Sequence, residues 1–264
     1  MSHPVDIPPP LQPRALGAPI GISVQQAHVA WGDNVLFDRL NLDLAAGRWT
    51  CLLGPSGVGK SMLLRLILGL EGTPGEPDSV TCSDGFPLAG RAAFMAQRDC
   101  LFPWLSVVEN VCLGHRLRSR RPLSATDEDR AMTLLDAVGL ADQADAMPNT
   151  LSGGMRQRTA LARTLMEDRP VVLMDEPFSA LDAITRIKLQ DLAARLLAGR
   201  TVLLVTHDPL EALRLGHHVH VMKGRPATLG PALQPAGPPP RPVADPAILE
   251  MQGDLLNQLT EAAL

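Results

Sequence analysis

The hydrophobic positions of the chain fall into short apolar runs and longer amphipathic segments. Runs rich in Val and Leu, without alternation between apolar and polar positions, occupy residues 50–53, 171–174 and 201–205. Such runs are typical of parallel strands that are covered on both faces. Helical spacing follows at 61–68, after a Gly-rich loop, and at 182–198. Strands that alternate with helices predict an α/β fold.

Two further kinds of segment interrupt this alternation. Residues 99–149 lack Val- and Ile-rich runs and hold helical patterns at 107–113 and 127–138, which indicates an inserted helical subdomain over about 99–157. A Pro-rich stretch at 226–246 is typical of an irregular tether or an extended segment. The predicted organisation is a Pro-rich N-terminal tail over 1–20, one main domain over 21–230, and a Pro-rich linker with a short C-terminal helix over 231–264.

Charge and composition exclude several classes of partner. With 24 basic and 28 acidic side chains the net charge is −4, which leaves no basic surplus for holding nucleic acid. Aromatic residues make up 3% of the chain and Tyr is absent, so stacking platforms for single strands are scarce. No apolar stretch reaches the roughly 18 residues that a membrane-spanning helix needs. The first residues lack the pattern of a secretory signal, so a cytoplasmic location is expected.

The loop after the first apolar run carries a phosphate-binding motif. Residues 54–61 read GPSGVGKS and match the P-loop pattern G-x-x-x-x-G-K-[ST]. Its glycines permit a backbone in which successive N–H groups converge on phosphate oxygens at the positive end of the following helix. Lys60 is expected to reach the β- and γ-phosphates, and the Ser61 hydroxyl to bind the Mg²⁺ that bridges them. The nucleotide-binding set predicted from this loop is Gly54, Pro55, Ser56, Gly57, Val58, Gly59, Lys60 and Ser61.

A P-loop needs an acidic partner for the metal, and the run at 171–174 ends in two carboxylates. Asp175 and Glu176 follow it directly, as in a Walker B element. Neighbouring side chains of a strand point in different directions. Asp175 is therefore expected to face the metal, and Glu176 to polarise an attacking water.

A second small, Gly-bearing turn precedes another helical pattern. Residues 151–157 read LSGGMRQ and offer free N–H groups and a hydroxyl to an anion. This turn resembles the signature motif of ATP-binding cassette (ABC) ATPases, and further motifs of that family occur in order along the chain. Gln97 resembles the Q-loop glutamine, residues 179–182 the D-loop, and His207 the switch histidine. The resemblance runs from about residue 22 to residue 229.

The resemblance implies an α/β P-loop NTPase fold, with a RecA-like parallel sheet, an antiparallel N-terminal β part and an inserted α-helical subdomain. It implies ATP hydrolysis, with ATP and Mg²⁺ as cofactors, in a head-to-tail homodimer that encloses two ATP molecules. The P-loop of one subunit would then face residues 152–154 of the other, so that ATP holds the dimer together and hydrolysis releases it. The presence of Glu176 and His207 disfavours a regulatory subunit that binds ATP without hydrolysis.

The roles of the family motifs carry over to the matching positions. Glu176 is implied as general base, His207 as a contact of the γ-phosphate, and Gln97 as the link from metal and water to a membrane partner. Asp182 is implied to communicate between the two sites. The implied Mg²⁺ ligands are Ser61, Gln97 and Asp175. The implied contacts to the ATP held by the other subunit are Ser152, Gly153, Gly154 and Gln157.

Two positions depart from the family pattern. The family usually stacks adenine on a Tyr upstream of the P-loop, and Trp31 stands at the matching place. Trp has the larger π-face, so stacking is expected to persist; an ordinary half-buried aromatic is the alternative. Met62 stands where the family more often has Thr, and its backbone N–H is expected to contact the nucleotide.

The segment from Gln97 to Val111 resembles the one through which importer ATPases receive a coupling helix of their permease. Phe102 and Trp104 would supply apolar contacts there; the alternative is that both pack inside the helical subdomain. The sequence is most similar in style to the nitrate, sulfonate and taurine importer group, and within it to ATPases for hydroxymethylpyrimidine-type thiamine precursors.

The resemblance therefore implies the ATP-hydrolysing subunit of a binding-protein-dependent importer for a small polar solute. Its partners would be transmembrane permease subunits and, indirectly, a periplasmic or other extracytoplasmic solute-binding protein, with no nucleic acid. Its place would be the cytoplasmic face of the inner membrane, as a peripheral protein. The alternative is a soluble ABC ATPase in DNA repair or cofactor assembly. The sequence does not contain the long coiled-coil or zinc insertions that repair ATPases need.

Overall fold

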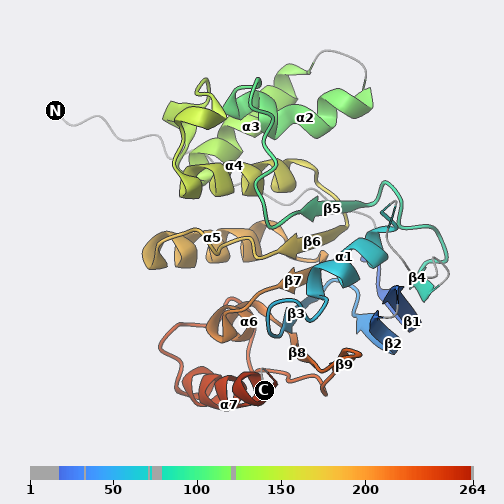
Figure 1. Ribbon diagram of the computed structural model, residues 1–264. Helices are drawn as coiled ribbons and strands as arrows, with labels where there is room; N and C mark the ends of the chain where they lie inside the picture. Colours follow the sequence, from blue (N-terminus) through green and yellow to red (C-terminus); the bar gives the residue numbers. More distant parts are fainter. Residues whose placement is uncertain (1–17, 33, 71, 73–78, 120–122, 263–264) are drawn as a thin grey trace.

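The computed structural model describes residues 18–32, 34–70, 72, 79–119 and 123–262. Within them the strands form a six-stranded sheet of order β5-β6-β7-β3-β8-β9 and a three-stranded sheet of order β2-β1-β4 (Figure 1). Strands β5, β6, β7, β3 and β8 are parallel, β9 is antiparallel to β8, and the smaller sheet is antiparallel. The strands are β1 (Ile22–Trp31), β2 (Asn34–Leu44), β3 (Trp49–Leu53), β4 (Val80–Cys82), β5 (Ala92–Met95), β6 (Val171–Asp175), β7 (Thr201–Val205), β8 (His218–Lys223) and β9 (Thr228–Leu229).

The helices follow the strands in the predicted alternation. They are α1 (Lys60–Leu68), α2 (Val107–Ser119), α3 (Ala125–Ala137), α4 (Gly153–Met166), α5 (Ala183–Leu196), α6 (Pro209–Leu215) and α7 (Pro246–Ala262), with short 3₁₀ turns at Ala141–Gln143 and Pro148–Thr150. The predicted α/β fold with an antiparallel N-terminal β part is confirmed. Among the described residues, no helix has the length and apolar character needed to span a bilayer.

The central strands lack alternation because each of their faces packs against its own hydrophobic core. In β6, Val172 and Met174 belong to the core under α2–α7, whereas Val171 and Leu173 belong to the core shared with α1, β1 and β2. Strands β3, β6 and β7 are buried at every position. The apolar runs predicted as doubly covered parallel strands are therefore strands of that kind.

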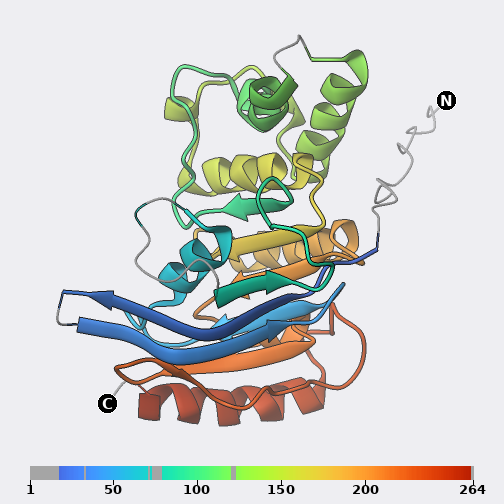
Figure 2. The same ribbon diagram turned by 90° about the vertical axis from the view of Figure 1, so that its right-hand side faces the viewer.

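Helices α2 and α3 lie away from the sheet, beyond α4, at the top of Figure 1. Figure 2 shows β1 and β2 running together along one side of the molecule, with α7 at its lower edge. The predicted limits of the helical subdomain, 99–157, and of the main domain, 21–230, stay predictions.

The Pro-rich segment after β9 is irregular, as predicted, since residues 230–245 form no helix and no named strand. It is not a free tether, however, because it is bound to the body of the protein. Arg241 is 3% exposed, and its guanidinium donates hydrogen bonds to the carbonyls of Leu213 and Gly216, both 2.8 Å away, at the end of α6. Beyond it, α7 has 17 residues, which is longer than the short helix predicted, and it buries Ile248 and Leu255. A buried cation surrounded by carbonyls and an apolar helix face hold the segment in place.

Candidate nucleotide-binding site

The loop between β3 and α1 has a backbone that only glycine adopts easily. Gly54, Gly57 and Gly59 have φ angles of 154°, 78° and 113°. A Cβ at Gly54 would lie 2.5 Å from the Met222 carbonyl oxygen, and one at Gly59 would lie 2.7 Å from the ring of Phe37. The glycines are therefore required twice, by their dihedral angles and by the close packing of the loop.

Lys60 begins α1, and its side chain bends back over the loop. Its Nζ donates hydrogen bonds to the carbonyl oxygens of Gly54, at 2.7 Å, and Pro55, at 2.9 Å. The side chain is 7% exposed, and this burial lowers the pKa of its ammonium below the usual value. An ammonium group held at the start of a helix places positive charge where the helix dipole already favours an anion.

A cavity of about 230 Å³ lies beside this loop. Its lining brings together the loop and the first turn of α1 (56–57 and 59–62) with Leu36, Gln97, Asp175 and Glu176. Of the nucleotide-binding residues predicted from the sequence, Ser56, Gly57, Gly59, Lys60, Ser61 and Met62 line it. Segments far apart in the sequence thus share one concave site, which is the usual setting for a small-molecule ligand.

The metal-binding residues predicted from the sequence also meet in this cavity. Asp175 ends β6, and its carboxylate forms a hydrogen bond with the Ser61 side chain. Burial raises the pKa of Asp175 above its usual value. The oxygens of Ser61, Asp175 and the Gln97 amide are of the kind that Mg²⁺ prefers, so these residues fit the ion. Among the described residues, no group of three or more His, Cys, Asp or Glu side chains could hold a metal ion.

The Glu176 carboxylate is the meeting point of the predicted catalytic residues. Its Oε2 lies 3.3 Å from Nδ1 of His207 and accepts a hydrogen bond from Nε2 of Gln97 at 3.4 Å. The His207 side chain is 62% exposed, while that of Glu176 is 17% exposed. An acid, an imidazole and an amide therefore face one point at the end of β6 and β7, which suits proton transfer to or from a water.

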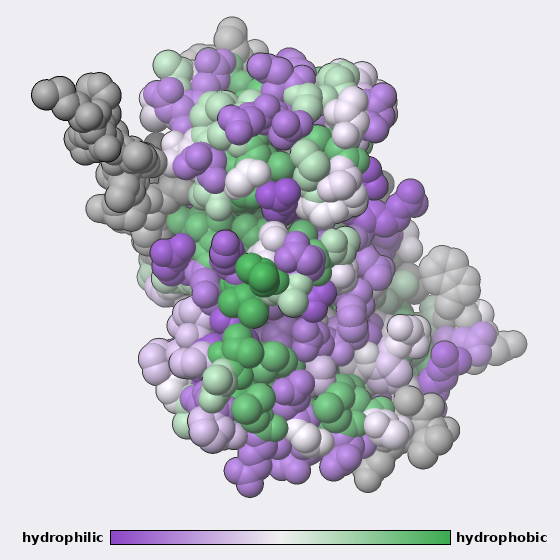
Figure 3. All heavy atoms as spheres, turned by 90° about the vertical axis from the view of Figure 1, so that its left-hand side faces the viewer, coloured by the Kyte–Doolittle hydropathy of each residue, from purple (hydrophilic) through white to green (hydrophobic). Residues whose placement is uncertain are grey.

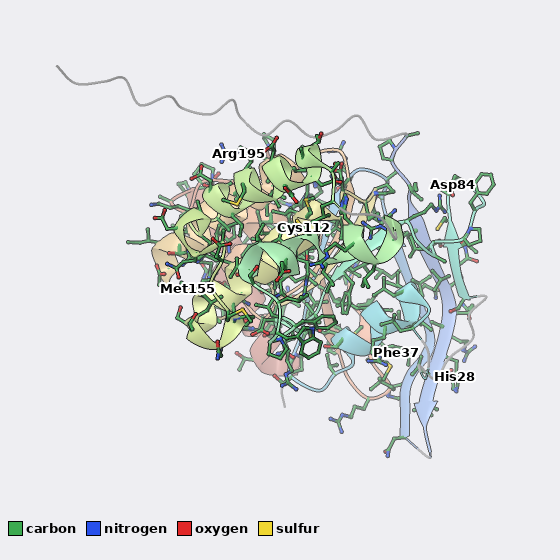
Figure 4. All side chains as sticks on the ribbon, turned by 90° about the horizontal axis from the view of Figure 1, so that it is seen from above. His28, Phe37, Asp84, Cys112, Met155 and Arg195 are labelled. Atoms are coloured by element: carbon green, nitrogen blue, oxygen red, sulfur yellow. The ribbon has the colours of Figure 1, made fainter. Side chains whose placement is uncertain are left out.

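The predicted second phosphate-binding turn lies elsewhere on the chain. Ser152 caps α4, because its Oγ accepts a hydrogen bond from the Met155 N–H at 3.2 Å. Ser152 and Gly153 are exposed, and neither lines the cavity. In Figure 4, Met155, in the first turn of α4, and Phe37, beside α1, lie on different sides of the molecule. The two turns of one chain therefore do not enclose a common ligand.

The structure corrects the role expected for Gln157. This residue was implied as a contact to the ATP held by another subunit, but its side chain is 7% exposed. Its amide forms hydrogen bonds with Glu176, Ser179 and Ala180 of the same chain. A buried amide with these partners is not available to a ligand outside the chain.

Two other predicted residues have roles within their own chain, and the side chain of a third lies outside the part of the chain that the structure describes. Asp182 caps α5, where its Oδ1 accepts a hydrogen bond from the Thr185 N–H at 3.0 Å, and this bond lowers its pKa. Val58 is 4% exposed and packs in the core shared with α1. Trp31 ends β1, and its side chain lies outside the described residues, so adenine stacking on Trp31 stays a prediction.

Sequence reasoning missed the part of the site that comes from β2. Leu36 lines the cavity, and Phe37 packs against Gly59 of the loop. Both stand in an ordinary strand pattern, so no local signal distinguishes them from other core residues. Only the pairing of distant segments brings them to the loop.

The aromatic residues after Gln97 form an exposed pair. The rings of Phe102 and Trp104 are stacked, with centroids 5.1 Å apart, and the two residues are 38% and 69% exposed. The alternative in which both aromatics pack inside the helical subdomain is therefore wrong. Exposed aromatic groups of this kind are characteristic of surfaces that contact other macromolecules.

Comparison with known proteins connects this site to a family. The chain matches the family model described as ABC transporter over residues 37–179. It is 43% identical to an uncharacterized ABC transporter ATP-binding protein of Haemophilus influenzae, over 90% of this chain and 98% of that protein. It is 40% identical to an aliphatic sulfonates import ATP-binding protein of Pseudomonas syringae, over 91% of this chain and 97% of that protein.

Solved structures give the same result. The dimeric structure of the bacterial ABC transporter cassette MJ0796 is similar with a TM-score of 0.71 and 29% identity, over 82% of this chain and 99% of that one. A dimeric post-hydrolysis state of that cassette, bound to ADP and Pi, has a TM-score of 0.70 and 28% identity, over 83% of this chain and 99% of that one.

Proposed function

The chain belongs to the ABC transporter ATP-binding family, and on that premise we propose that it is the ATP-hydrolysing subunit of a membrane importer for a small polar solute. The observation that carries this proposal is the cavity in which the glycine loop, Lys60, Asp175 and Glu176 meet, with Gln97 and His207 at the same carboxylate. A phosphate-binding loop beside a carboxylate that can accept a proton from water is the arrangement that nucleotide hydrolysis requires.

Each residue of the site has a role that follows from its position. The backbone N–H groups of the loop and the Lys60 ammonium hold the phosphates. Glu176 accepts the proton of the attacking water at its carboxylate, and His207, 3.3 Å away, is placed to contact the γ-phosphate. Bound Mg²⁺ neutralises charge on the phosphates, and Ser61, Asp175 and Gln97 are the residues that would hold it.

The open turn before α4 supports a homodimer. Ser152, Gly153 and Gly154 start a helix outside the cavity, so their free N–H groups are available to a nucleotide bound on a second copy. Helices α4 and α5 begin on the left of Figure 1, and Figure 3 looks at that face, where hydrophobic groups are exposed between hydrophilic ones. Ile184, in the first turn of α5, is 69% exposed. The similar cassette that forms a dimer strengthens this proposal.

The exposed pair Phe102 and Trp104 is the proposed contact to the permease. The pair stands in the segment 97–111, a few residues after Gln97, whose amide donates a hydrogen bond to Glu176. A permease helix bound to this pair would therefore lie close to Gln97, whose amide contacts Glu176. We place the protein at the cytoplasmic face of the cell membrane on this ground, with a solute-binding protein acting through the permease.

The solute is the least constrained part of the proposal, because the solute binds to the permease and the binding protein. Relatives named as aliphatic sulfonates import ATP-binding proteins favour an aliphatic sulfonate. The thiamine-precursor pyrimidine remains the second candidate from sequence style. No observation on the described residues favours the alternative of an ABC ATPase without a permease.

The experiment that tests the proposal is affinity purification of the tagged chain from detergent-solubilised native membranes, with mass spectrometry of the bound proteins. Co-purification of a permease and a solute-binding protein is expected, and calorimetry on the binding protein with ethanesulfonate and hydroxymethylpyrimidine then separates the two solutes. The chain with Trp104→Ala is expected to lose the permease, while Phe86→Ala, at a residue 69% exposed, keeps it. Recovery of soluble partners alone would contradict the importer.

A further inference from the structure

The side chain of Gln157 connects the helix that starts at the open turn to the loop that follows β6. Gln157 stands in the second turn of α4. Its Nε2 donates to the carbonyl oxygen of Glu176 at 3.1 Å and to Oγ of Ser179 at 3.3 Å. Its Oε1 accepts from the N–H of Ala180 at 2.8 Å. Both ends of the amide are therefore bonded within one short loop, which fixes the loop against α4.

The residue held by these bonds has an unusual backbone conformation. Glu176 has a φ of 49°, in the left-handed region that residues with a Cβ rarely adopt. Its N–H donates to the Val205 carbonyl at 2.9 Å, and its own carbonyl accepts from Gln157 and from Ser179 Oγ. Such a conformation persists only where surrounding groups impose it. This backbone conformation sets the direction of the Cα–Cβ bond of Glu176, and therefore the region that its carboxylate can reach.

Another observation excludes a simpler role for Gln157. It does not line the cavity, and its exposure of 7% leaves no surface for a ligand. Any effect on hydrolysis must therefore pass through Glu176, Ser179 or Ala180. Ala180 precedes Asp182 in the D-loop, and a Cβ at Gly154 would lie 3.4 Å from the Ala180 carbonyl, so the start of α4 contacts the same loop.

We propose that Gln157, on α4, is a positioning residue that holds Glu176 in its left-handed conformation. The helix that faces the ATP bound to the second copy thus positions the base that acts on the ATP of its own chain. The inference rests on the proposed dimer. In that dimer the first turn of α4 touches the nucleotide on the second copy, while Gln157 acts on the Glu176 of its own chain. A displacement of α4 by the partner's nucleotide therefore moves the base of the opposite site.

Steady-state kinetics test the positioning role. Gln157→Met keeps the length of the side chain and removes the amide, and it is expected to lower kcat about 10- to 100-fold with KM for ATP within about threefold. Gln190→Met is the matched control, since Gln190 is 2% exposed and lies on α5, where its amide accepts from Arg214. The control is expected to keep kcat within about twofold. An unchanged kcat in Gln157→Met overturns the inference.

Mixed dimers decide on which site Gln157 acts. In one arrangement a Gln157→Met chain is paired with a Glu176→Gln chain, so the only intact base belongs to the chain without Gln157. In the other, both substitutions are in one chain and the partner is unaltered. Against a dimer of wild type and Glu176→Gln, single-turnover hydrolysis is expected to fall about tenfold or more in the first arrangement and to stay within about twofold in the second.

The opposite pattern would show that Gln157 acts on the ATP of the other subunit, and equal losses would show a general effect on the dimer; either overturns the inference. A wild-type chain that neither dimerises with ATP nor hydrolyses it overturns the proposed function instead, and this is seen before any variant is made.

Discussion

Two helices of this chain begin at Gly-bearing turns, and the two turns differ in how they are enclosed. The turn before α1 is closed by its own chain, since Phe37 and Met222 lie against its glycines and Lys60 is 7% exposed. The turn before α4 is open, because Gly153 is exposed and a Cβ there would have only the Arg156 guanidinium within 4 Å, at 3.9 Å.

The glycines of the two turns therefore serve different purposes. Gly54 and Gly59 have positive φ angles, whereas Gly153 and Gly154 are absent from the positive-φ residues of the described chain. At α1, glycine supplies a conformation, so one chain shapes its phosphate loop by itself. At α4, glycine supplies access, because a bare backbone lets another molecule come close to the N–H groups. The first turn is shaped by one chain, and in the proposed dimer the second turn is completed by a second copy.

The largest expected effect comes from removing the charge at the closed turn. Lys60→Ala is expected to lower ATP affinity more than about tenfold and hydrolysis more than about 100-fold, because the ammonium contacts the phosphates in both ground and transition states. Calorimetry with ATP and a phosphate-release assay measure the two. Lys188→Ala, at an exposed position of α5, is the matched control. Unchanged ATP hydrolysis by Lys60→Ala would show that the turn before α1 is not part of the nucleotide site.

Replacing Glu176 tests the turn before α4 separately from the turn before α1. Glu176→Gln is expected to lower hydrolysis more than about 100-fold while leaving ATP binding intact, because the amide cannot accept the proton of water. With ATP and Mg²⁺ this variant should elute as a dimer in size-exclusion chromatography, and adding Ser152→Ala should weaken that dimer. A monomer under these conditions would mean that the open turn is not closed by a second copy.

Alanine at matched glycines tests the comparison most directly. Gly59→Ala combines a φ of 113° with a contact at 2.7 Å to Phe37, and it is expected to destabilise the fold by about 2–4 kcal/mol. Gly153→Ala meets only the Arg156 guanidinium, at an ordinary contact distance of 3.9 Å. Its effect on unfolding should therefore stay within about 0.5 kcal/mol, while ATP-driven dimerisation weakens. Urea denaturation and size-exclusion chromatography give the two readouts. Equal loss of stability at both positions would contradict the distinction.

The smallest expected effect is on the pH dependence of stability, and it comes from the first turn of α6. This turn holds a buried acid and no phosphate-binding glycines. Glu211 is 4% exposed, and its Oε1 lacks a partner among the described residues. Burial, with a contribution from Asp208, raises its pKa to about 8, against the opposing effect of Arg186. The native state therefore binds a proton that the unfolded chain has released above its ordinary pKa. Stability from this group is present below about pH 4.5 and is lost as the pH rises through about 8.

Thermal unfolding between about pH 6 and 8.5 measures this contribution, which has a slope of at most about 1.4 kcal/mol per pH unit. Glu211→Gln removes the titrating group, so its stability is expected to fall less over this range than that of the wild-type chain. His217 also affects stability near pH 6.5, because burial lowers its native pKa to about 4 and only the unfolded chain binds its proton there. This contribution is the same in both proteins, so the difference between their pH curves reports Glu211. Parallel pH curves for the two proteins would show that Glu211 is ionised in the native state.

The residues whose position was predictable are those fixed by the local chain. The runs at β3, β6 and β7 specify buried strands, and the loop at 54–61 has a backbone that its own glycines determine. The carboxylates Asp175 and Glu176 had to stand at a strand end because the apolar run stops there. Such signals need only neighbours in sequence, so the fold class and the closed turn could be identified before the structure.

The residues that were misjudged depend on partners far along the chain. Gln157 stands in a motif that predicts phosphate binding, but its amide forms hydrogen bonds with the loop at 176–180. The Pro-rich segment after β9 resembles a tether, but Arg241 binds it to the end of α6. In both cases a buried polar side chain binds backbone groups far along the chain, which are carbonyls for Arg241 and a carbonyl and an N–H for Gln157.

The sequence by itself determined the α/β alternation, the two glycine turns and the acids at the end of β6, because short-range periodicity and backbone freedom are properties of adjacent residues. Tertiary structure alone decided that Gln97 and His207 meet at Glu176, that Phe102 and Trp104 are exposed, and that the Gln157 amide binds the Glu176 carbonyl. The reason is physical: the direction and burial of a side chain are set by the elements packed around it, and those elements come together only in the folded chain.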